Sequence, residues 1–251
     1  MFNKQKESYD AKKYFESGHR TSLANEFSDG MTVSPDYNPI NIRFYYNSVE
    51  NSMLKYFSSH DKPKNPTVLD IGSGAGHWID FYSDVFDSDQ LVSLEISSYL
   101  VEALANKYKM TNKVQFVEGD ISSSNFTLGD LQFDIVNAIG IMFHIVDDSA
   151  WETAIKNISN LMRKDGLFII SGQFGFITQD VQFHQTDEFN NWDEQENSPK
   201  TNILVNKRIR SLRYWKKIAA RNGLKVESLV KTKQSKIMST PENNILVLKK
   251  Q

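Results

Sequence analysis

The sequence contains no cysteine and no long apolar run. Without cysteine there is no disulfide, thiolate nucleophile, zinc–thiolate site or iron–sulfur cluster, so chemistry that begins with a cysteine attack is excluded. No stretch approaches the roughly 20 apolar residues needed to span a bilayer, and the polar N-terminal stretch lacks the apolar core of a signal peptide. We therefore expect a cytoplasmic protein with no membrane partner, and we identify no metal-ligating motif.

Charge of either sign is also not in excess. The chain has 251 residues with 29 Lys+Arg and 31 Asp+Glu, a formal net charge of −2. This balance gives no general electrostatic reason to bind nucleic acid. The length fits one large α/β domain with an elaborated end, or two small domains.

From Pro66 onward, strand-like apolar runs alternate with helical patterns. Expected strands are Val68–Ile71, Gln90–Glu95, Val114–Glu118, Phe133–Ile139, a run that opens at Leu167–Ile170, Lys225–Val230 and Asn244–Lys249. One expected helix follows Gly76. The others are expected from Ser97 or Ser98 to about Tyr108, from Asp147 or Asp148 to Met162, and from Lys207 to Asn222. A turn is expected at Lys164–Gly166. Such alternation predicts right-handed βαβ units and a mostly parallel sheet with helices on both faces.

The stretch DIGSGAGHW places Gly72, Gly74 and Gly76 between the first strand and its helix. Glycine accepts positive φ and lets a ligand approach the backbone, and the N–H groups at the helix start favour a negatively charged or accepting group. The spacing is not the dinucleotide fingerprint G-x-G-x-x-G, because His77 stands at its third glycine, and no G-K-[ST] of a P-loop follows. Asp70, two residues before the first glycine, would repel a pyrophosphate and suits a cationic amine.

Further polar residues end the neighbouring strands. Glu95 lies about 20 residues after the loop, where a carboxylate can hold two ribose hydroxyls. Asp120 and Asn137 follow or end the next two strands, so all these side chains are expected at the carboxyl edge of the sheet, where ligands of such folds bind. Singly, each acid could be a cap or a surface carboxylate. Jointly they indicate an adenosine with an amino acid attached and no phosphate, which is S-adenosylmethionine.

The segments VLDIGSGAGHW, SLEIS, VEGDI and FDIVNAIGIMFHI resemble the successive motifs of the class I S-adenosylmethionine-dependent methyltransferase superfamily. The resemblance covers about Pro66 to Gln173 and implies a Rossmann-like seven-stranded sheet of order 3-2-1-4-5-7-6. It also implies S-adenosylmethionine as cofactor and S-adenosylhomocysteine as product. The cofactor-binding residues it implies are Asp70, Gly72, Ser73, Gly74 and Gly76 for the methionine part, Glu95 for the ribose, Ile96, Asp120 and Ile121 for the adenine, and Asn137 and Ala138 beside the sulfonium.

Two regions lie outside this core. Residues 1–60 are expected to form an N-terminal helical cap or lid, and residues 61–251 the methyltransferase domain, with a lid insertion at about 174–206. A long loop of this kind is usually functional or else disordered. Both regions can roof the carboxyl edge with aromatic side chains. The substrate-binding candidates are Tyr37, Tyr45, Tyr46, Phe143, Phe174 and Trp192, and for each of them simple core packing is the alternative.

The methyl acceptor is expected to be a small molecule that is methylated on O or N, less readily on S. The Asp/Asn-Pro-Pro-aromatic motif of enzymes that methylate nucleic-acid bases is absent, since Asn137 is followed by Ala-Ile-Gly. The basic stretch Lys207–Lys217 could form an RNA- or protein-binding face, although a charge run at helical spacing is usually solvated. A non-catalytic S-adenosylmethionine-binding protein would share every cofactor residue, and an aminopropyl transferase would need acids after the fourth strand to hold a polyamine.

His144 lies just beyond the fourth expected strand, in the sequence IMFHIVDD. A neutral imidazole can accept a proton from a hydroxyl or an ammonium near neutral pH. His144 is therefore the candidate catalytic base. The alternative is a packing role, with its ring held by Asp147 or Asp148.

Overall fold

The computed structural model describes residues 10–12, 15–16, 39–60, 63–88, 90–184, 203–232 and 244–251. The helices are α3 (Pro39–Ser59), α4 (His77–Phe86), α5 (Ser98–Lys107), α6 (Asp148–Leu161) and α7 (Leu212–Arg221), with a 3-10 turn η1 (Met142–His144). The strands are β1 (Thr67–Ile71), β2 (Gln90–Glu95), β3 (Val114–Glu118), β4 (Phe133–Ala138), β5 (Met162–Gly172), β6 (Gln179–His184), β7 (Ile203–Ile209), β8 (Leu224–Val230) and β9 (Asn244–Lys250).

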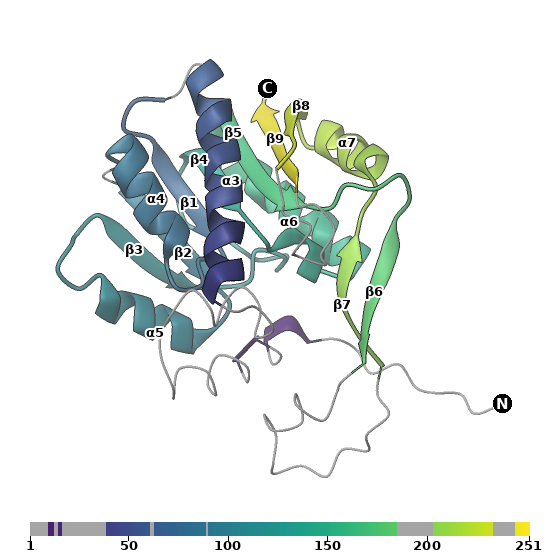
Figure 1. Ribbon diagram of the computed structural model, residues 1–251, viewed down its shortest axis with the longest axis horizontal. Coiled ribbons are helices and arrows are strands. Elements are labelled where there is room, and N and C mark those ends of the chain that lie inside the picture. The colour runs from purple at the N-terminus through teal and green to yellow at the C-terminus, as the bar shows by residue number, and fades with distance from the viewer. Residues whose placement is uncertain are drawn as a thin grey trace, which may run out of the picture.

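Seven strands form one twisted sheet in the order β3-β2-β1-β4-β5-β9-β8 (Figure 1). Strands β1 to β5 pair in parallel, whereas β9 is antiparallel to both β5 and β8. When only the strands of this sheet are numbered, the order is 3-2-1-4-5-7-6, and the predicted Rossmann-like class is confirmed. The labels shift because β6 and β7 form a separate two-stranded sheet.

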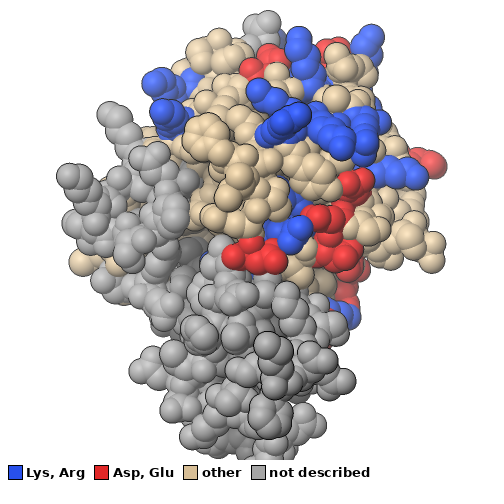
Figure 2. All heavy atoms as spheres, turned by 90° about the vertical axis from the view of Figure 1, so that its right-hand side faces the viewer, with Lys and Arg blue, Asp and Glu red and all other residues tan. Residues whose placement is uncertain are grey.

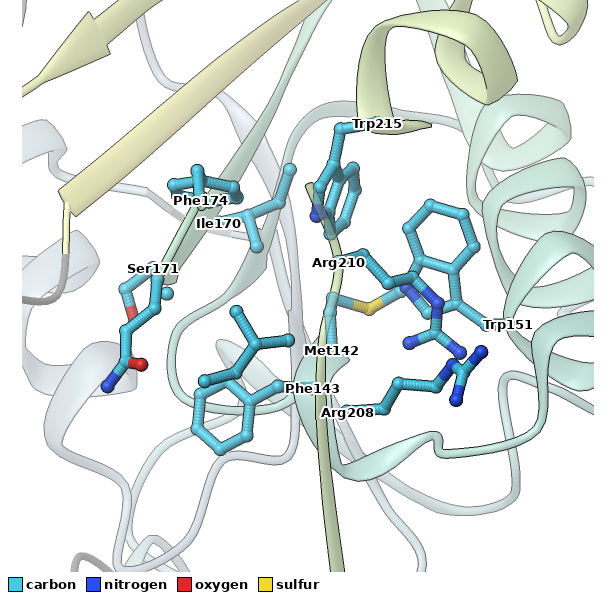
Figure 3. A pocket seen from close by; sticks show the side chains of 12 residues that line it. Met142, Phe143, Trp151, Ile170, Ser171, Phe174, Arg208, Arg210 and Trp215 are labelled. Carbon is cyan, nitrogen blue, oxygen red and sulfur yellow. The ribbon is translucent and has the colours of Figure 1, made fainter. Parts of the chain in front are cut away.

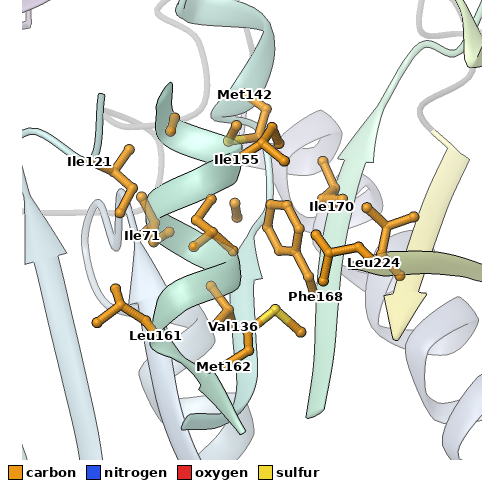
Figure 4. Close-up of a cluster of buried hydrophobic side chains, with 14 of the residues drawn as sticks. Ile71, Ile121, Val136, Met142, Ile155, Leu161, Met162, Phe168, Ile170 and Leu224 are labelled. Carbon is orange, nitrogen blue, oxygen red and sulfur yellow. The ribbon is translucent and has the colours of Figure 1, made fainter. Parts of the chain in front are cut away.

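Each face of the sheet is covered by helices, because the central strands are apolar on both sides. On one face α6 and α7 bury a cluster that includes Trp151, Ile155 and Phe168 (Figure 4). On the other face α3 and α4 pack against the sheet through residues such as Val49 and Tyr82. The two layers leave the carboxyl ends of the parallel strands as the open edge of the domain.

The helix α3 packs against a face of the sheet and not over its open edge. Its side chains Val49, Met53 and Phe57 share a buried cluster with Val68 of β1 and Val247 of β9. Residues 39–59 of the predicted cap therefore complete the domain core. Earlier in the chain, residues 11–12 and 15–16 are helical, while Tyr37 lies outside the described residues.

The predicted insertion after β5 contains regular structure that its irregular polar pattern did not indicate. Strands β6 and β7 form an antiparallel hairpin that extends beyond the sheet (Figure 1), and residues 185–202 between them, with Trp192, lie outside the described part of the chain. The prediction of a helix from Lys207 was wrong at its start. Lys207–Ile209 end β7, and the helix begins after Ser211, whose side chain accepts a hydrogen bond from the Tyr214 N–H.

The predicted turn at residues 164–166 is an irregularity inside β5. Asp165 has a φ of 64°, and the pairing of β5 with β4 shifts register in this region. The chain therefore bends there without leaving the sheet. Among the described helices, none is both long and apolar enough to cross a membrane.

The basic residues of α7 lie on its exposed face. Arg213, Lys216, Lys217 and Arg221 are all exposed, and the opposite face of the helix buries Trp215 and Ile218. Figure 2 looks onto this side of the molecule and shows basic side chains directly above a group of acidic ones. The surface here carries charges of both signs rather than a uniform positive potential.

Candidate functional site

The turn between β1 and α4 holds three glycines in the left-handed region. Gly72, Gly74 and Gly76 have φ values of 71°, 56° and 92°. L side chains are disfavoured at such angles, and a Cβ on Gly72 would also overlap the side chain of Ile141. The turn is tied down by hydrogen bonds from the Gly72 N–H to the Leu94 carbonyl (2.8 Å) and from the Gly76 N–H to the Ser73 carbonyl (2.8 Å). The three glycines thus take the positive φ values that the sequence predicts for this turn.

Asp70 is the penultimate residue of β1, directly before this turn, and is only 1% exposed. Its Oδ1 accepts a hydrogen bond of 2.7 Å from the Asn137 amide, whereas its buried Oδ2 has no partner among the described residues. Burial raises the pKa of Asp70 from 3.8 to about 6, although the hydrogen bond from Asn137 and the nearby Ser73 hydroxyl oppose the rise. A buried carboxylate oxygen without a donor is costly, so this atom is suited to a cationic or N–H donor from a ligand.

Asn137 connects Asp70 to the helix layer. It is fully buried at the end of β4, and its Oδ1 accepts a hydrogen bond of 3.1 Å from the Tyr82 hydroxyl of α4. Ser73 adds a second connection, because its hydroxyl donates to the Asp70 carbonyl (3.1 Å) and accepts from Ser93 (2.8 Å). This network fixes the direction in which the Asp70 carboxylate points.

Replacing Tyr82 with phenylalanine tests the network. We expect Tyr82→Phe to lower the free energy of unfolding by about 1 kcal/mol, because a buried hydrogen bond is lost while the ring packing is kept. Urea denaturation measures this change. Tyr108→Phe, which removes a part-exposed hydroxyl bonded to the Gly76 carbonyl and Asp80, is the matched control and should cost less. Equal stability of Tyr82→Phe and the wild type would contradict the role of this bond.

Glu95 ends β2 on the other side of the turn and is 5% exposed. Its Oε1 accepts from the Gly74 N–H (3.0 Å) and its Oε2 from the Ile96 N–H (3.1 Å). Burial, together with the nearby Asp70 charge, raises the pKa of Glu95 from 4.5 to about 7, against the effect of these backbone donors. Each carboxylate oxygen keeps a lone pair for a ligand hydroxyl.

Asp120 lies after β3, where its Oδ1 accepts from the backbone N–H and the hydroxyl of Ser122 (2.8 and 2.7 Å). It is exposed, whereas the adjacent Ile121 is buried and Ile96 is half-buried. Ala138 is fully buried directly after Asn137. The carboxyl edge thus brings together the ends of β1, β2, β3 and β4, with every residue of the predicted cofactor set placed on it or next to it.

The predicted substrate-binding residues divide into two groups. Tyr45 and Tyr46 are buried in α3, where Tyr46 stacks on His77 with ring centroids 3.6 Å apart, so both rings are packed side chains. Phe143 and Phe174 are only partly buried and line a narrow pocket just beyond the ends of β4 and β5. The second pair therefore lies at a pocket near the end of β4.

His144 ends η1, beside this pocket. Its ring meets the ring of Phe15 edge-on at 5.1 Å and that of Phe143 at 4.6 Å. The two acids that could hold the His144 ring both have other partners. Asp147 caps α6 by accepting a hydrogen bond from the Ala150 N–H, and Asp148 pairs with Arg208 and Arg210.

Sequence reasoning missed the charged wall of this pocket (Figure 3). Arg208 and Arg210 leave the end of the hairpin toward α6, and both bind Asp148, with Nε–O distances of 3.0 Å. Arg210 is 2% exposed, and its guanidinium lies 4.5 Å from the ring centroid of Trp151. The R-x-R alternation was the available signal, since period two places both side chains on one side of a strand. Within the described residues no group of acidic and histidine side chains could hold a metal ion.

Residues 68–166 match the model of a protein family described as a methyltransferase domain. Among curated proteins, no significant match is found. Among solved structures, the chain is similar to magnesium protoporphyrin IX methyltransferase from Synechocystis PCC 6803 with bound S-adenosylmethionine, with a TM-score of 0.64, 16% identity, and 97% of this chain and 99% of that chain covered.

Two further structures are similar over most of their length. One is the N-methyltransferase NodS from Bradyrhizobium japonicum WM9 with S-adenosylhomocysteine, with a TM-score of 0.59, 12% identity and coverage of 94% and 98%. The other is an S-adenosylmethionine-dependent methyltransferase from Clostridium acetobutylicum ATCC 824, with a TM-score of 0.62, 13% identity and coverage of 92% and 98%. At these identities the similarity shows the fold. The domain match adds that residues 68–166 are similar in sequence to a methyltransferase domain.

Proposed function

We propose that this protein transfers a methyl group from S-adenosylmethionine to an O or N atom of a small-molecule acceptor. The observation that carries the proposal is the unpaired Oδ2 of buried Asp70, next to a glycine turn and a second buried acid, Glu95. This donor set fits a ligand with a cationic amine and vicinal hydroxyls. It does not suit a pyrophosphate, whose charge both carboxylates would repel.

The roles of the individual residues follow from this fit. Asp70 would hold the ammonium of the methionine part, and Glu95 the ribose hydroxyls. Asp120 would accept from the adenine amine, while Ile96 and Ile121 pack on the ring. When bound, the cofactor would supply the methyl group of its sulfonium. The acceptor atom would take this methyl group by in-line displacement, and the neutral thioether would leave. What the chain adds is positioning of the acceptor and exclusion of water.

Two features support a small-molecule acceptor: the pocket beside the end of β4 and the mixed charge around α7. A narrow pocket lined in part by Phe143 and Phe174 lies beside the end of β4. The basic face of α7, which is the alternative docking surface for RNA, lies next to acidic groups (Figure 2), and the chain has a net charge of −2. RNA binding depends on an uncompensated positive surface.

A roof formed by the N-terminal segment is part of the proposal. Two of its side chains reach separate points on the carboxyl edge: Lys12 donates to Glu118 at the end of β3 (2.7 Å), and Phe15 meets His144 beyond β4. These contacts span the strand ends that flank the proposed cofactor site. A segment held at both ends can exclude water from the reaction.

One experiment tests the proposed reaction. The protein is incubated with S-adenosylmethionine carrying an isotope-labelled methyl group and a pool of metabolites or of RNA, and mass spectrometry identifies what acquires the label. We expect a labelled small molecule. Binding of the cofactor without labelling of any acceptor would indicate a non-catalytic protein, and labelled RNA would overturn the choice of acceptor.

His144 is the candidate general base. We expect His144→Ala to lower kcat at least about tenfold. General-base catalysis supplies ~10²–10⁴-fold, and the smaller bound allows for an acceptor with a low pKa, which needs less help. Cofactor affinity should stay within about threefold, because the cofactor side of the edge is unchanged. His144→Gln keeps a polar side chain and is the matched control, with a similar loss expected. Unchanged turnover of His144→Ala across about pH 6–9 would exclude a role in proton transfer.

A further inference from the structure

The end of α5 contacts the backbone of the glycine turn. Lys107, the last residue of α5, donates a hydrogen bond from Nζ to the Ala75 carbonyl (2.9 Å). The hydroxyl of Tyr108, which is the C-cap of this helix, donates to the Gly76 carbonyl (3.0 Å). Two successive carbonyls of the turn between β1 and α4 are therefore held by side chains of another helix.

Asp80 joins these two side chains to α4. Its Oδ2 accepts from Lys107 Nζ (3.0 Å), and its Oδ1 accepts from the Tyr108 hydroxyl (2.6 Å). Asp80 lies in the first turn of α4 and Lys107 in the last turn of α5, so each charge also interacts favourably with the dipole of its own helix. Lys107, Tyr108 and Asp80 thus form one connected group, which we call the α5 brace.

Tyr108 is fixed by packing as well as by hydrogen bonds. Its ring stacks on that of Phe116 in β3 with the centroids 5.8 Å apart, and Lys107 Nζ lies 4.8 Å from the centroid of the Tyr108 ring. A Cβ on Gly76 would come within 2.5 Å of the Tyr108 hydroxyl oxygen. Glycine at position 76 therefore permits the close approach of Tyr108 in addition to the φ of 92°.

The residue after Gly76 is held by a different helix. His77 Nε2 lies 2.7 Å from Oε1 of Glu50 in α3, and the His77 ring stacks on that of Tyr46 with the centroids 3.6 Å apart. The start of α4 is therefore tied to α3 through His77. The two peptide groups before His77 are restrained by the α5 brace.

The brace is expected to matter little for folding. The side chains of Lys107 and Asp80 are 36% and 52% exposed, and exposed ion pairs contribute little to stability. A glycine-rich turn, in contrast, has many accessible conformations unless its peptide groups are held. The larger consequence of the brace is therefore for the turn, where it fixes two successive carbonyls.

We propose that Lys107 and Tyr108 are positioning residues for the cofactor. They orient the Ala75 and Gly76 peptide groups against which the methionine part binds, without contacting the cofactor themselves. The assignment rests on the proposed function, which places the methionine part at this turn. Glu95 accepts from the Gly74 N–H and keeps the ribose side of the turn in place when the brace is lost. The brace therefore acts on the amino-acid end of the cofactor rather than on its nucleoside end.

Titration calorimetry of S-adenosylhomocysteine tests the proposal. Lys107→Met removes the charge and both hydrogen bonds but keeps an apolar stem against the Tyr108 ring, and it should lower the affinity at least about threefold. The double variant Lys107→Met, Tyr108→Phe should lower it about tenfold or more. Lys107→Arg can still donate to a carbonyl and a carboxylate at once, so it should retain most of the affinity.

Lys113→Met is the matched control. Lys113 pairs with Asp87 (3.5 Å), the C-cap of α4, at the end of this helix far from the turn. In urea denaturation Lys107→Met and Lys113→Met should lose similar, small amounts of stability, whereas only Lys107→Met should lose affinity. Full affinity of Lys107→Met and of the double variant would overturn the proposal, and so would an equal loss of affinity in Lys113→Met.

A second ligand, 5′-methylthioadenosine, locates the effect, because it keeps the adenosine and the thioether but lacks the amino acid. NMR titration, which also follows weak binding, should give the same affinity within about twofold for the wild type and Lys107→Met. An equal loss for both ligands would mean a general distortion of the site and would overturn the assignment. A wild type that binds neither ligand would contradict the proposed function together with the brace. A wild type that binds S-adenosylhomocysteine no better than the variants do contradicts the brace alone.

Discussion

Asp70→Asn is expected to change stability and cofactor binding in opposite directions. In the protein without ligand, the charge of Asp70 is costly, since burial raises its pKa from 3.8 to about 6. A shift of this size corresponds to about 3 kcal/mol when the group is ionised in both states. Part of this gain is offset because the new amide N–H also lacks a partner in the buried position of Oδ2. We therefore expect the free energy of unfolding to rise by about 1–2 kcal/mol at pH 8.

Cofactor binding should fall in the same variant. A hydrogen bond to a charged group contributes about 1.5–3 kcal/mol, so we expect the affinity for S-adenosylmethionine to drop about 10- to 150-fold. Urea denaturation and titration calorimetry measure the two effects. Asp87→Asn is the control, because it removes an exposed carboxylate that pairs with Lys113 at 3.5 Å, and it should alter neither quantity by more than a few tenths of a kcal/mol. A variant that is more stable yet binds the cofactor with full affinity would refute the role of Asp70.

Much of the site could be predicted because local patterns determine it. The apolar run before Gly72 forms a buried parallel strand, and the side chains that follow such strands meet at one edge of the sheet. Asp70, Glu95 and Asn137 end three neighbouring strands in the structure for this reason. The residue types alone could not predict the pKa values of Asp70 and Glu95. These values are raised by burial, and the burial depends on segments far away in the sequence.

The acceptor side was predicted less well. The hairpin β6–β7 has little alternation in its sequence, and its strands are joined by a long segment, so its pairing depends on contacts that no local pattern encodes. The basic stretch after residue 206 was interpreted with a helical period throughout, although its first residues follow the strand period. As a result Arg208 and Arg210 were assigned to a solvated face. In the structure Asp148 and Trp151 of α6 hold them at the pocket.

The two buried acids also predict an unusual pH dependence. An acid whose pKa is raised on folding binds its proton more tightly in the folded state, so the free energy of unfolding falls as the pH rises between the unfolded and folded pKa values. For Asp70 this interval is about pH 4 to 6, and for Glu95 about pH 4.5 to 7. Each shift corresponds to about 3 kcal/mol, and together they should make the ligand-free protein several kcal/mol less stable at pH 8 than at pH 4.5 through these groups.

Comparison with the double variant Asp70→Asn, Glu95→Gln isolates this contribution. The difference in unfolding free energy between variant and wild type should be small near pH 4.5 and should grow up to about pH 8. Cofactor affinity of the wild type should rise in the same interval, at least about tenfold between pH 5 and 7, because the ammonium and the ribose hydroxyls bind the ionised forms. Cofactor binding thus offsets the loss of folding stability that the two ionised, buried carboxylates cause in the ligand-free protein. If urea denaturation gave a pH-independent difference, or calorimetry a pH-independent affinity, neither acid would be held at a raised pKa, and the site would have to recognise its ligand by other groups.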